Sequence, residues 1–276
     1  MLRITVLVEN TASGQELLAE HGLSFWIAYG EHRLLFDTGQ GYVLKHNARQ
    51  LSVPLDTAEA LILSHGHYDH AGGLVEALET HPAPTVFLHP AALEPKFAQR
   101  SDGIAREIGM PTRCRRFFQE KVQPVWTETP TRICEGVYVT GPVPRQTEYE
   151  DAGGPFFVDS DCRQPDDFPD DQALYMETKA GTVVVLGCAH AGVINTLSYV
   201  RELTDNRPIY AVIGGMHLVA AGPERLEKTI AALSQINPRY LMPLHCTGFP
   251  AMARLHHEFP EQYRSCPVGT TIELPL

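Results

Sequence analysis

Residues 59–73 have the sequence EALILSHGHYDHAGG, which places four strong metal ligands directly after an apolar segment typical of a strand. In an extended or tightly looped backbone, side chains two residues apart point the same way, so His65 and His67 can bind one ion. Asp69 and His70 follow closely and are placed to bind a second ion. Imidazole and carboxylate ligands suit zinc and other transition metals. The stretch therefore predicts a metal centre at the end of a strand.

The residues that follow predict how this loop is held. Gly72 and Gly73 precede an apolar pattern over 74–78 that is typical of a helix. We therefore expect a strand-to-helix loop, with the helix beginning just past the ligands. A fortuitous histidine cluster at the surface is the simpler alternative, but polar groups at the end of a buried strand need partners.

The rest of the chain alternates between strand and helix patterns after a β-rich start. Apolar and β-branched runs predict strands at 2–8, 24–29, 33–36, 61–64, 85–88, 182–186, 209–213 and 241–244. Helical faces are expected over 194–203 and over 226–233, the second ending at Asn237-Pro238. This order matches a two-sheet sandwich covered by helices.

We expect a single domain over residues 1–276, with an inserted, lid-like segment at 91–171. The pattern loosens across this segment, and its acidic, proline-bearing part at 159–171 is typical of a long loop. Long loops in compact enzymes usually act as lids or binding loops.

The spacing of His65, His67, Asp69 and His70 resembles the H-x-H-x-D-H signature of the metallo-β-lactamase superfamily. Further segments resemble one branch of it, named for 7,8-dihydropterin-6-methyl-4-(β-D-ribofuranosyl)-aminobenzene-5'-phosphate synthase of methanopterin biosynthesis. These segments are Phe36–Gly39, Asp171–Leu174, Gly187–Gly192, Gly214–Leu218 and Leu244–Gly248. The resemblance implies an α/β (α+β) fold, the metallo-β-lactamase αββα sandwich, in which helices flank two mixed β-sheets.

The resemblance also implies a dinuclear ligand set. His65, His67 and His190 are assigned to the first metal, and Asp69, His70 and His245 to the second. His245 matches the last histidine of the superfamily, but Cys188 stands where a bridging aspartate is expected. Two zinc ions are the expected cofactors from the ligand types, with iron or manganese as alternatives.

Several of these assignments leave alternatives open. Cys188 could bind metal as a thiolate or be a small buried residue. His190 could support another ligand or fill the core instead of binding metal. His217 could be a ligand, a substrate contact or a structural residue, and we expect it to donate a proton or anchor the substrate. Asp69 is expected to orient the attacking hydroxide.

Two further residues are candidates outside the ligand set. Asp37 follows a strand and resembles the superfamily's buried aspartate that accepts the ring N–H of a ligand histidine, although the sequence also allows a turn-forming role before Thr38-Gly39. Arg145 lies in a loop rich in glycine and proline, where it could bind a phosphate or carboxylate or simply contact solvent.

The charge of the chain limits its partners. With 22 basic and 33 acidic residues the formal net charge is −11, and the main basic cluster is the short run at 113–116. A nucleic-acid partner needs a broad basic surface, so we expect none. The expected partner is a small-molecule substrate, anionic or phosphorylated, held by the metals and a few local cations. The pattern assigns no oligomeric state.

The sequence has no long apolar segment and no C-x-x-C pair, and these two features predict the compartment and the redox state of the cysteines. No stretch approaches ~20 apolar residues, and Met1-Leu2-Arg3-Ile4 leads directly into a strand pattern, so we expect a cytoplasmic protein without a membrane partner. Six cysteines without a C-x-x-C pair suggest reduced thiols. They are Cys114, Cys134, Cys162, Cys188, Cys246 and Cys266.

The ligand set predicts a metal-dependent hydrolase. A metal-bound water has its pKa lowered from about 15.7 toward ~7, which supplies a hydroxide for attack on a small ester or phosphoester. A pterin-transferring synthase with a pyrophosphate leaving group is one alternative, implied by the name of the branch. A binding protein without turnover is another, because the bridging carboxylate is missing.

Overall fold

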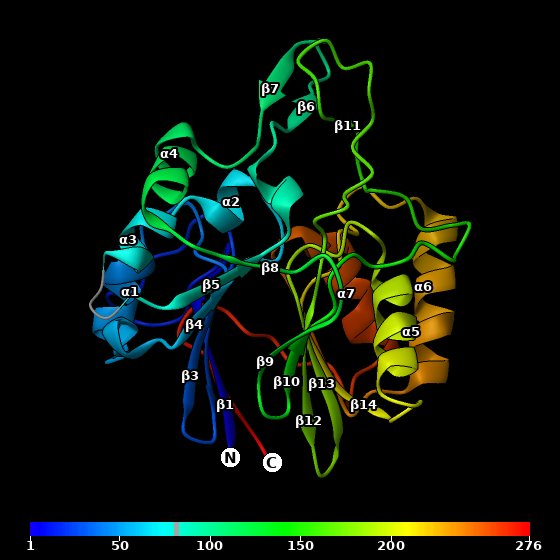
Figure 1. The fold of residues 1–276 in the computed structure, drawn as a ribbon. Helices are drawn as coiled ribbons and strands as arrows, with labels where there is room; N and C mark the ends of the chain where they lie inside the picture. Colours follow the sequence, from blue (N-terminus) through cyan, green and yellow to red (C-terminus); the bar gives the residue numbers. More distant parts are fainter. Residues whose placement is uncertain (80–82) are drawn as a thin grey trace. The chain divides into compact units, whose positions relative to one another are not determined.

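The computed structural model describes residues 1–79 and 83–276. The chain divides into two compact units. The first comprises 1–128, 155–166 and 267–276, and the second comprises 129–154 and 167–266. Each unit is built on its own mixed sheet with helices on one face (Figure 1).

The first unit contains a seven-stranded sheet with the order β16-β1-β2-β3-β4-β5-β8. The pairs β16–β1, β1–β2 and β2–β3 are antiparallel, whereas β3, β4, β5 and β8 run parallel to one another. The strands are β1 (Leu2–Val8), β2 (Ser24–Tyr29), β3 (His32–Phe36), β4 (Ala60–Ile62), β5 (Thr85–Leu88), β8 (Val125–Trp126) and β16 (Thr271–Leu274).

Helices cover one face of this sheet. Leu35 and Leu61 of the strands pack in one apolar cluster with Leu44 of α1, Leu74 of α3 and Phe118 of α4. The helical segments are α1 (Leu44–Gln50), η1 (Leu55–Thr57), α2 (Tyr68–Ala71), α3 (Leu74–Leu78), η2 (Pro90–Leu93) and α4 (Thr112–Lys121). Burial of these side chains removes apolar surface from water and fixes the strand ends that carry the ligand motif.

A small three-stranded sheet in the first unit projects beyond the main sheet (Figure 1). It has the order β11-β6-β7, with β6 (Phe97–Gln99), β7 (Ala105–Glu107) and β11 (Phe156–Phe157). Its base contains a buried ion pair, in which Lys96 Nζ lies 2.9 Å from Asp166 Oδ2. Burying both charges together compensates part of their desolvation.

The second unit contains a six-stranded sheet with the order β15-β14-β13-β12-β10-β9. Strands β13, β14 and β15 are parallel, so their carboxyl ends meet at one edge of the sheet. The strands are β9 (Thr131–Cys134), β10 (Val137–Val139), β12 (Leu174–Thr178), β13 (Gly181–Leu186), β14 (Ile209–Gly215) and β15 (Tyr240–Leu244). All of β13 is buried, as expected for a β-branched run within a sheet.

Three helices pack on one face of this second sheet (Figure 1). They are α5 (Val193–Leu203), α6 (Pro223–Ile236) and α7 (Phe249–Glu258), and η3 (His245–Thr247) precedes α7. Helix α6 has proline at its first position and ends at Asn237, which adopts a left-handed conformation with φ of 50°. Both features are common helix boundaries, and the end coincides with the predicted stop at Asn237-Pro238.

The predicted lid segment at 91–171 contains elements of both units. Helix α4 and strand β8 belong to the first unit, and β9 and β10 belong to the second. Residues 159–171 contain no helix or strand, as expected from their composition. A single domain over 1–276 with a lid at 91–171 stays a prediction. Across the described residues no helix has the length and apolar character needed to span a membrane.

Candidate metal centre

The H-x-H-x-D-H motif follows β4 in the first unit and brings three histidine rings together. The His65 and His67 rings have centroids 4.6 Å apart, and those of His65 and His70 are 4.2 Å apart. The backbone is extended at His67, and the one-turn helix α2 begins at Tyr68. This turn was not predicted, whereas the helix expected just past the ligands is present as α3, over Leu74–Leu78. All three rings are buried, with exposed fractions of 5% or less.

A buried carboxylate and a hydroxyl orient two of these rings. Asp37 Oδ2 lies 2.7 Å from His70 Nδ1 and also accepts the Ser64 hydroxyl at 2.7 Å. Because the Ser64 O–H is donated to Asp37, its oxygen accepts from His65 Nδ1, 2.9 Å away. Both histidines thus carry their proton on Nδ1, and the nitrogen that would bind metal is Nε2. Ser64 had no predicted role.

Asp69 has a neighbour that the sequence did not reveal. His21 Nε2 lies 3.1 Å from Asp69 Oδ2, and the His21 side chain is 54% exposed. No motif surrounds His21, which lies in an irregular segment between β1 and β2. Only the folded chain brings these two residues together.

In the second unit, His190 and His217 form a buried pair. Their ring centroids are 4.3 Å apart. The Phe168 ring stacks on the His190 ring, with the two centroids 4.1 Å apart. His190 Nδ1 lies 3.0 Å from the backbone oxygen of Ala152. A carbonyl oxygen can only accept a hydrogen bond, so Nδ1 carries the proton. A metal would therefore be bound through Nε2.

The loop that carries Ala152 is attached to the beginning of α5. The Glu150 carboxylate accepts the N–H groups of Ile194 at 2.9 Å and Asn195 at 2.8 Å. Asn195 Oδ1 in turn accepts two backbone N–H groups of the loop, at Gln146 and Thr147. Burial raises the pKa of Glu150, with these backbone hydrogen bonds opposing the shift. The loop and the His190 turn therefore form one hydrogen-bonded structure.

Two charged residues contact the backbone of the His190 turn. Arg145 donates to the backbone oxygen of His190 at 3.0 Å. Asp171 Oδ2 accepts the N–H of Ala191 at 2.8 Å. Burial raises the pKa of Asp171 to about 7, aided by the charge of Asp170 and opposed by backbone hydrogen bonds and by Arg145. The predicted role of Arg145 in substrate binding stays a prediction.

A second cluster lies where β13 and β15 end. The Sγ atoms of Cys188 and Cys246 and a ring nitrogen of His245 all lie within 4.8 Å of one another. All three residues are buried. The sequence singled out Cys188 and His245, whereas Cys246 had no predicted role.

Several predicted site residues adopt left-handed backbone conformations. Asp37 has φ of 56°, His217 43° and His245 50°, and Ala189, between Cys188 and His190, has 54°. Such conformations cost free energy for residues with a Cβ and concentrate at functional sites.

The donors within each unit suit a metal. The Nδ1 atoms of His65, His70 and His190 each face a defined acceptor, which is the arrangement that metal-binding histidines require. Asp69 adds a carboxylate, and Cys188 adds a soft sulfur donor. The donor chemistry therefore fits zinc or a similar ion. The metal-binding and catalytic roles themselves stay predictions.

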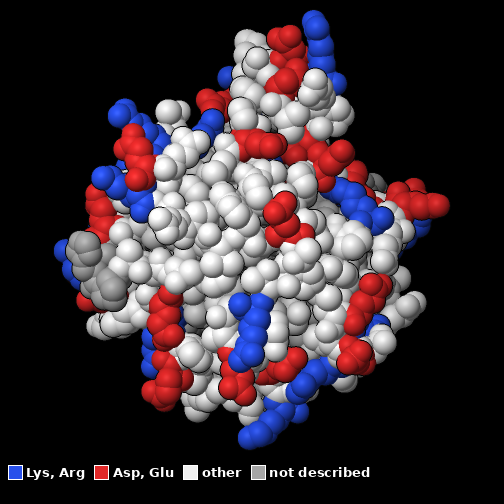
Figure 2. All heavy atoms as spheres, viewed as in Figure 1, with Lys and Arg blue, Asp and Glu red and all other residues white. Residues whose placement is uncertain are grey.

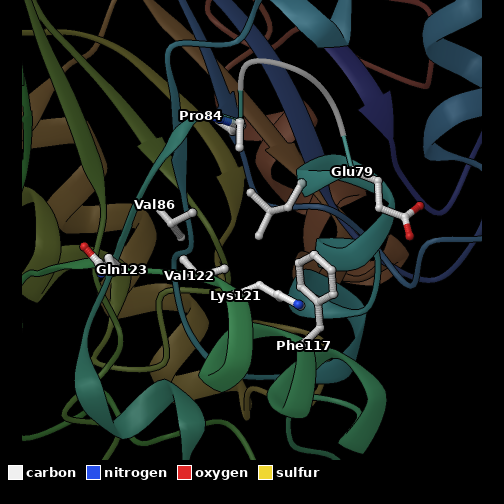
Figure 3. Close-up of a pocket in the computed structure, with 9 residues that line it drawn as sticks. Glu79, Pro84, Val86, Phe117, Lys121, Val122 and Gln123 are labelled. Carbon is white, nitrogen blue, oxygen red and sulfur yellow. The ribbon is translucent and has the colours of Figure 1, made fainter.

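The surface offers two further observations. A cavity of about 440 Å³ lies between the ends of α3 and α4 and strand β5 (Figure 3), and no predicted site residue is among the residues that line it. On the face shown in Figure 2, lysine and arginine side chains are interspersed with acidic ones. Among the described residues on that face, no continuous basic area is visible.

The family model of the metallo-beta-lactamase superfamily matches residues 18–224. A solved structure described as Tm1679, a metal-dependent hydrolase of the beta-lactamase superfamily, is 31% identical, covers 100% of both chains and superimposes with a TM-score of 0.85. The chain therefore belongs to the metallo-β-lactamase superfamily and has its fold. The predicted resemblance and fold class are confirmed.

Two curated relatives come from Methanocaldococcus jannaschii. An uncharacterized protein is 32% identical over 253 residues, which is 91% of this chain and 93% of that protein. The 7,8-dihydropterin-6-methyl-4-(β-D-ribofuranosyl)-aminobenzene-5'-phosphate synthase is 28% identical over 285 residues, which is 99% of this chain and 96% of that protein. The similarity to the synthase branch is thereby confirmed.

Proposed function

We propose that this protein is a metal-dependent hydrolase that acts on a small ester or phosphoester. The observation that carries the proposal is the buried histidine set after β4, with His65 and His70 oriented by Ser64 and Asp37. The similarity over the full chain to a protein described as a metal-dependent hydrolase supports it.

The proposed ligands are those assigned from the sequence, with Cys188 at the position of the expected bridging aspartate. His65, His67 and His190 would bind one zinc ion, and Asp69, His70 and His245 the other. When bound, such ions lower the pKa of a coordinated water toward ~7 and polarise the substrate oxygen. Asp69 would accept a hydrogen bond from the attacking nucleophile and so orient it.

His217 would serve as proton donor or substrate anchor. Its ring is buried, with 8% exposure, and lies beside His190, which places an ionisable group near a proposed ligand. A histidine in this position can give a proton to a leaving oxygen near neutral pH.

The proposed substrate is small and anionic. A net charge of −11 repels anions at long range, so a local cation is needed to hold one. Arg145 meets this need, since a guanidinium has five N–H donors and the carbonyl of His190 accepts from only one of its nitrogens. We propose that 91–171, which contains Arg145, forms the lid over the substrate.

Elemental analysis of the purified protein tests the metal centre. About two metal ions per chain are expected, with a loss in both His190→Ala and His245→Ala. His257→Ala is the control, because His257 is an exposed residue on α7. Metal content that is unchanged by both ligand substitutions would contradict the assignment. A panel of carboxylic and phosphate esters then tests hydrolysis, and full metal loading without turnover would favour a binding protein.

The relative named as a synthase gives a second candidate function, transfer of a pterin group with release of pyrophosphate. In this reaction the arylamine nitrogen forms a bond to the pterin methylene carbon, and the carbon–oxygen bond to pyrophosphate breaks. Incubation with a dihydropterin pyrophosphate, with and without an arylamine, separates the candidates. Pyrophosphate release that requires the amine supports the synthase, and release into water alone supports the hydrolase.

A further inference from the structure

The ends of β13 and β15 in the second unit bring two thiols and an imidazole together. Cys188 follows β13 by one residue, and His245 and Cys246 follow β15 directly. Their Sγ atoms and a ring nitrogen of His245 lie within 4.8 Å of one another, and their exposed fractions are 3%, 3% and 8% in chain order. Cys188 and Cys246 are not joined in a disulfide.

The strand between them leaves the space that this cluster needs. Strand β14 lies between β13 and β15 and ends with Gly214-Gly215. A Cβ atom on Gly215 would lie 2.5 Å from Cys246 Sγ, which is too close for any side chain. Glycine at this strand end therefore allows the Cys246 side chain to extend toward Cys188, whose backbone oxygen lies 3.6 Å from Cys246 Sγ.

The backbone around the cluster is held in an uncommon conformation. His245 has φ of 50° and begins the short helix η3, which turns the chain so that successive residues offer an imidazole and a thiol. Thr247 Oγ1 accepts the N–H of Met216 at 3.1 Å and so attaches η3 to the end of β14. A strained backbone fixed by such contacts is typical of a preorganised site.

We infer that Cys188, His245 and Cys246 bind one soft divalent ion such as Zn²⁺ or Cd²⁺ through two thiolates and one imidazole. Each thiol releases its proton to solvent as its metal–sulfur bond forms, and no electron is transferred. Thiolate ligands select zinc and cadmium over manganese and magnesium. The inference deepens the proposed function, because it rests on metal binding by His245 and assigns that metal a sulfur environment.

Cobalt titration of the full-length, metal-free protein tests the inference without an activity assay. Co²⁺ bound by thiolates gives a sulfur-to-metal charge-transfer absorption in the near ultraviolet. We expect this band in the wild type, a large loss of its intensity in Cys188→Ser and in Cys246→Ser, and affinity for the ion weaker by about tenfold or more in each. Cys266→Ser is the matched control, since Cys266 is also buried in the second unit but lies outside the cluster. Equal bands in all four proteins would overturn the inference.

Zinc X-ray absorption of the wild type covers the case in which the serine variants fail to fold. A sulfur shell at ~2.3 Å supports the inference, whereas only nitrogen and oxygen neighbours at ~2.0–2.1 Å overturn it. The same measurement separates the two proposals. Bound zinc with no sulfur neighbour contradicts the thiolate site alone, while a chain that binds no metal contradicts the proposed function as well.

Discussion

In the first unit, the candidate ligands lie within residues 65–70, whereas those of the second unit follow three separate strands. The first set is oriented by side chains, because Asp37 and Ser64 accept from the ring nitrogens of His70 and His65. In the second unit, His190 is oriented by a backbone oxygen, that of Ala152. A side-chain acceptor can be removed by one substitution. A backbone acceptor can only be moved, through the residues that position its loop.

This difference predicts the largest effect for Asp37→Ala. The buried carboxylate accepts the N–H and O–H of Ser64 and the Nδ1–H of His70, and the substitution leaves these donors without an acceptor. We expect a loss of about 3–5 kcal/mol in the free energy of unfolding, measured with urea. Asp56→Ala on the surface is the control. A loss below about 1 kcal/mol would show that the motif does not depend on its carboxylate.

In the second unit, we expect a substitution in the loop that carries Ala152 to lower stability, because this loop supplies the backbone acceptor for His190. Gly153 has φ of +82°, and a Cβ there would lie 2.0 Å from His217 Nδ1. Gly103 has nearly the same φ, +81°, with nothing within 4 Å of its Cβ position, so it is the matched control. Both alanine variants should lose about 1 kcal/mol to the backbone, and Gly153→Ala about 1–3 kcal/mol more through the clash.

The rate of ester hydrolysis gives a second measurement on the Gly153→Ala and Gly103→Ala variants. Gly153→Ala should lower kcat/KM by about tenfold, because His217 or the loop must move, while Gly103→Ala keeps the wild-type value. Equal stability and equal kcat/KM for the two variants would show that the loop does not position His217.

The stability contributed by Glu150, which joins the loop that carries Ala152 to the beginning of α5, should depend on pH. Burial raises the pKa of Glu150 above its ordinary value of 4.5, so the folded protein holds this proton more tightly than the unfolded chain. The contribution of the carboxyl to stability is therefore full below pH 4.5 and falls as the pH rises through the raised pKa. Glu150→Gln should remove this decline, measured as urea unfolding of the metal-free protein at several pH values. Glu148→Gln, exposed on the same loop, should keep it.

His21→Ala should have the smallest effect. The pair of His21 with Asp69 is half exposed, and such pairs contribute about 0–1 kcal/mol. Metal affinity should change by about fivefold or less, measured by competition with a chelator. A loss of a hundredfold or more, about 2.7 kcal/mol, would instead make His21 a ligand in its own right.

The sequence predicted the elements whose patterns are local. Strands β1, β2 and β5 have the predicted bounds, and the end of α6 falls at its predicted stop. Each of these depends on a short run rich in apolar and β-branched residues or on a helix boundary residue. The helix expected over 74–78 is α3, but the short helix α2 was not predicted, because a single helical turn inside a ligand motif has no apolar period to reveal it.

The partners of the candidate ligands were harder to predict. Asp37 was singled out because it follows a strand and resembles a family position. Its contact with His70 spans 33 residues of sequence, and the bond between Glu150 and Ile194 spans 44. No local pattern marks such pairs, since they depend on how loops meet after the sheets have formed. Ser64, His21 and Cys246 were missed for the same reason.

The parallel arrangement of β13, β14 and β15 has a consequence for how this chain can diverge. Each strand end presents its own chemical groups, and the backbone ladder behind them stays in register whichever side chains they carry. Natural variation or directed evolution can therefore exchange a donor at one strand end at a time. New specificities should arise first at these positions. Residues 65–70 lie in one short segment and depend on one another, so they would have to change together.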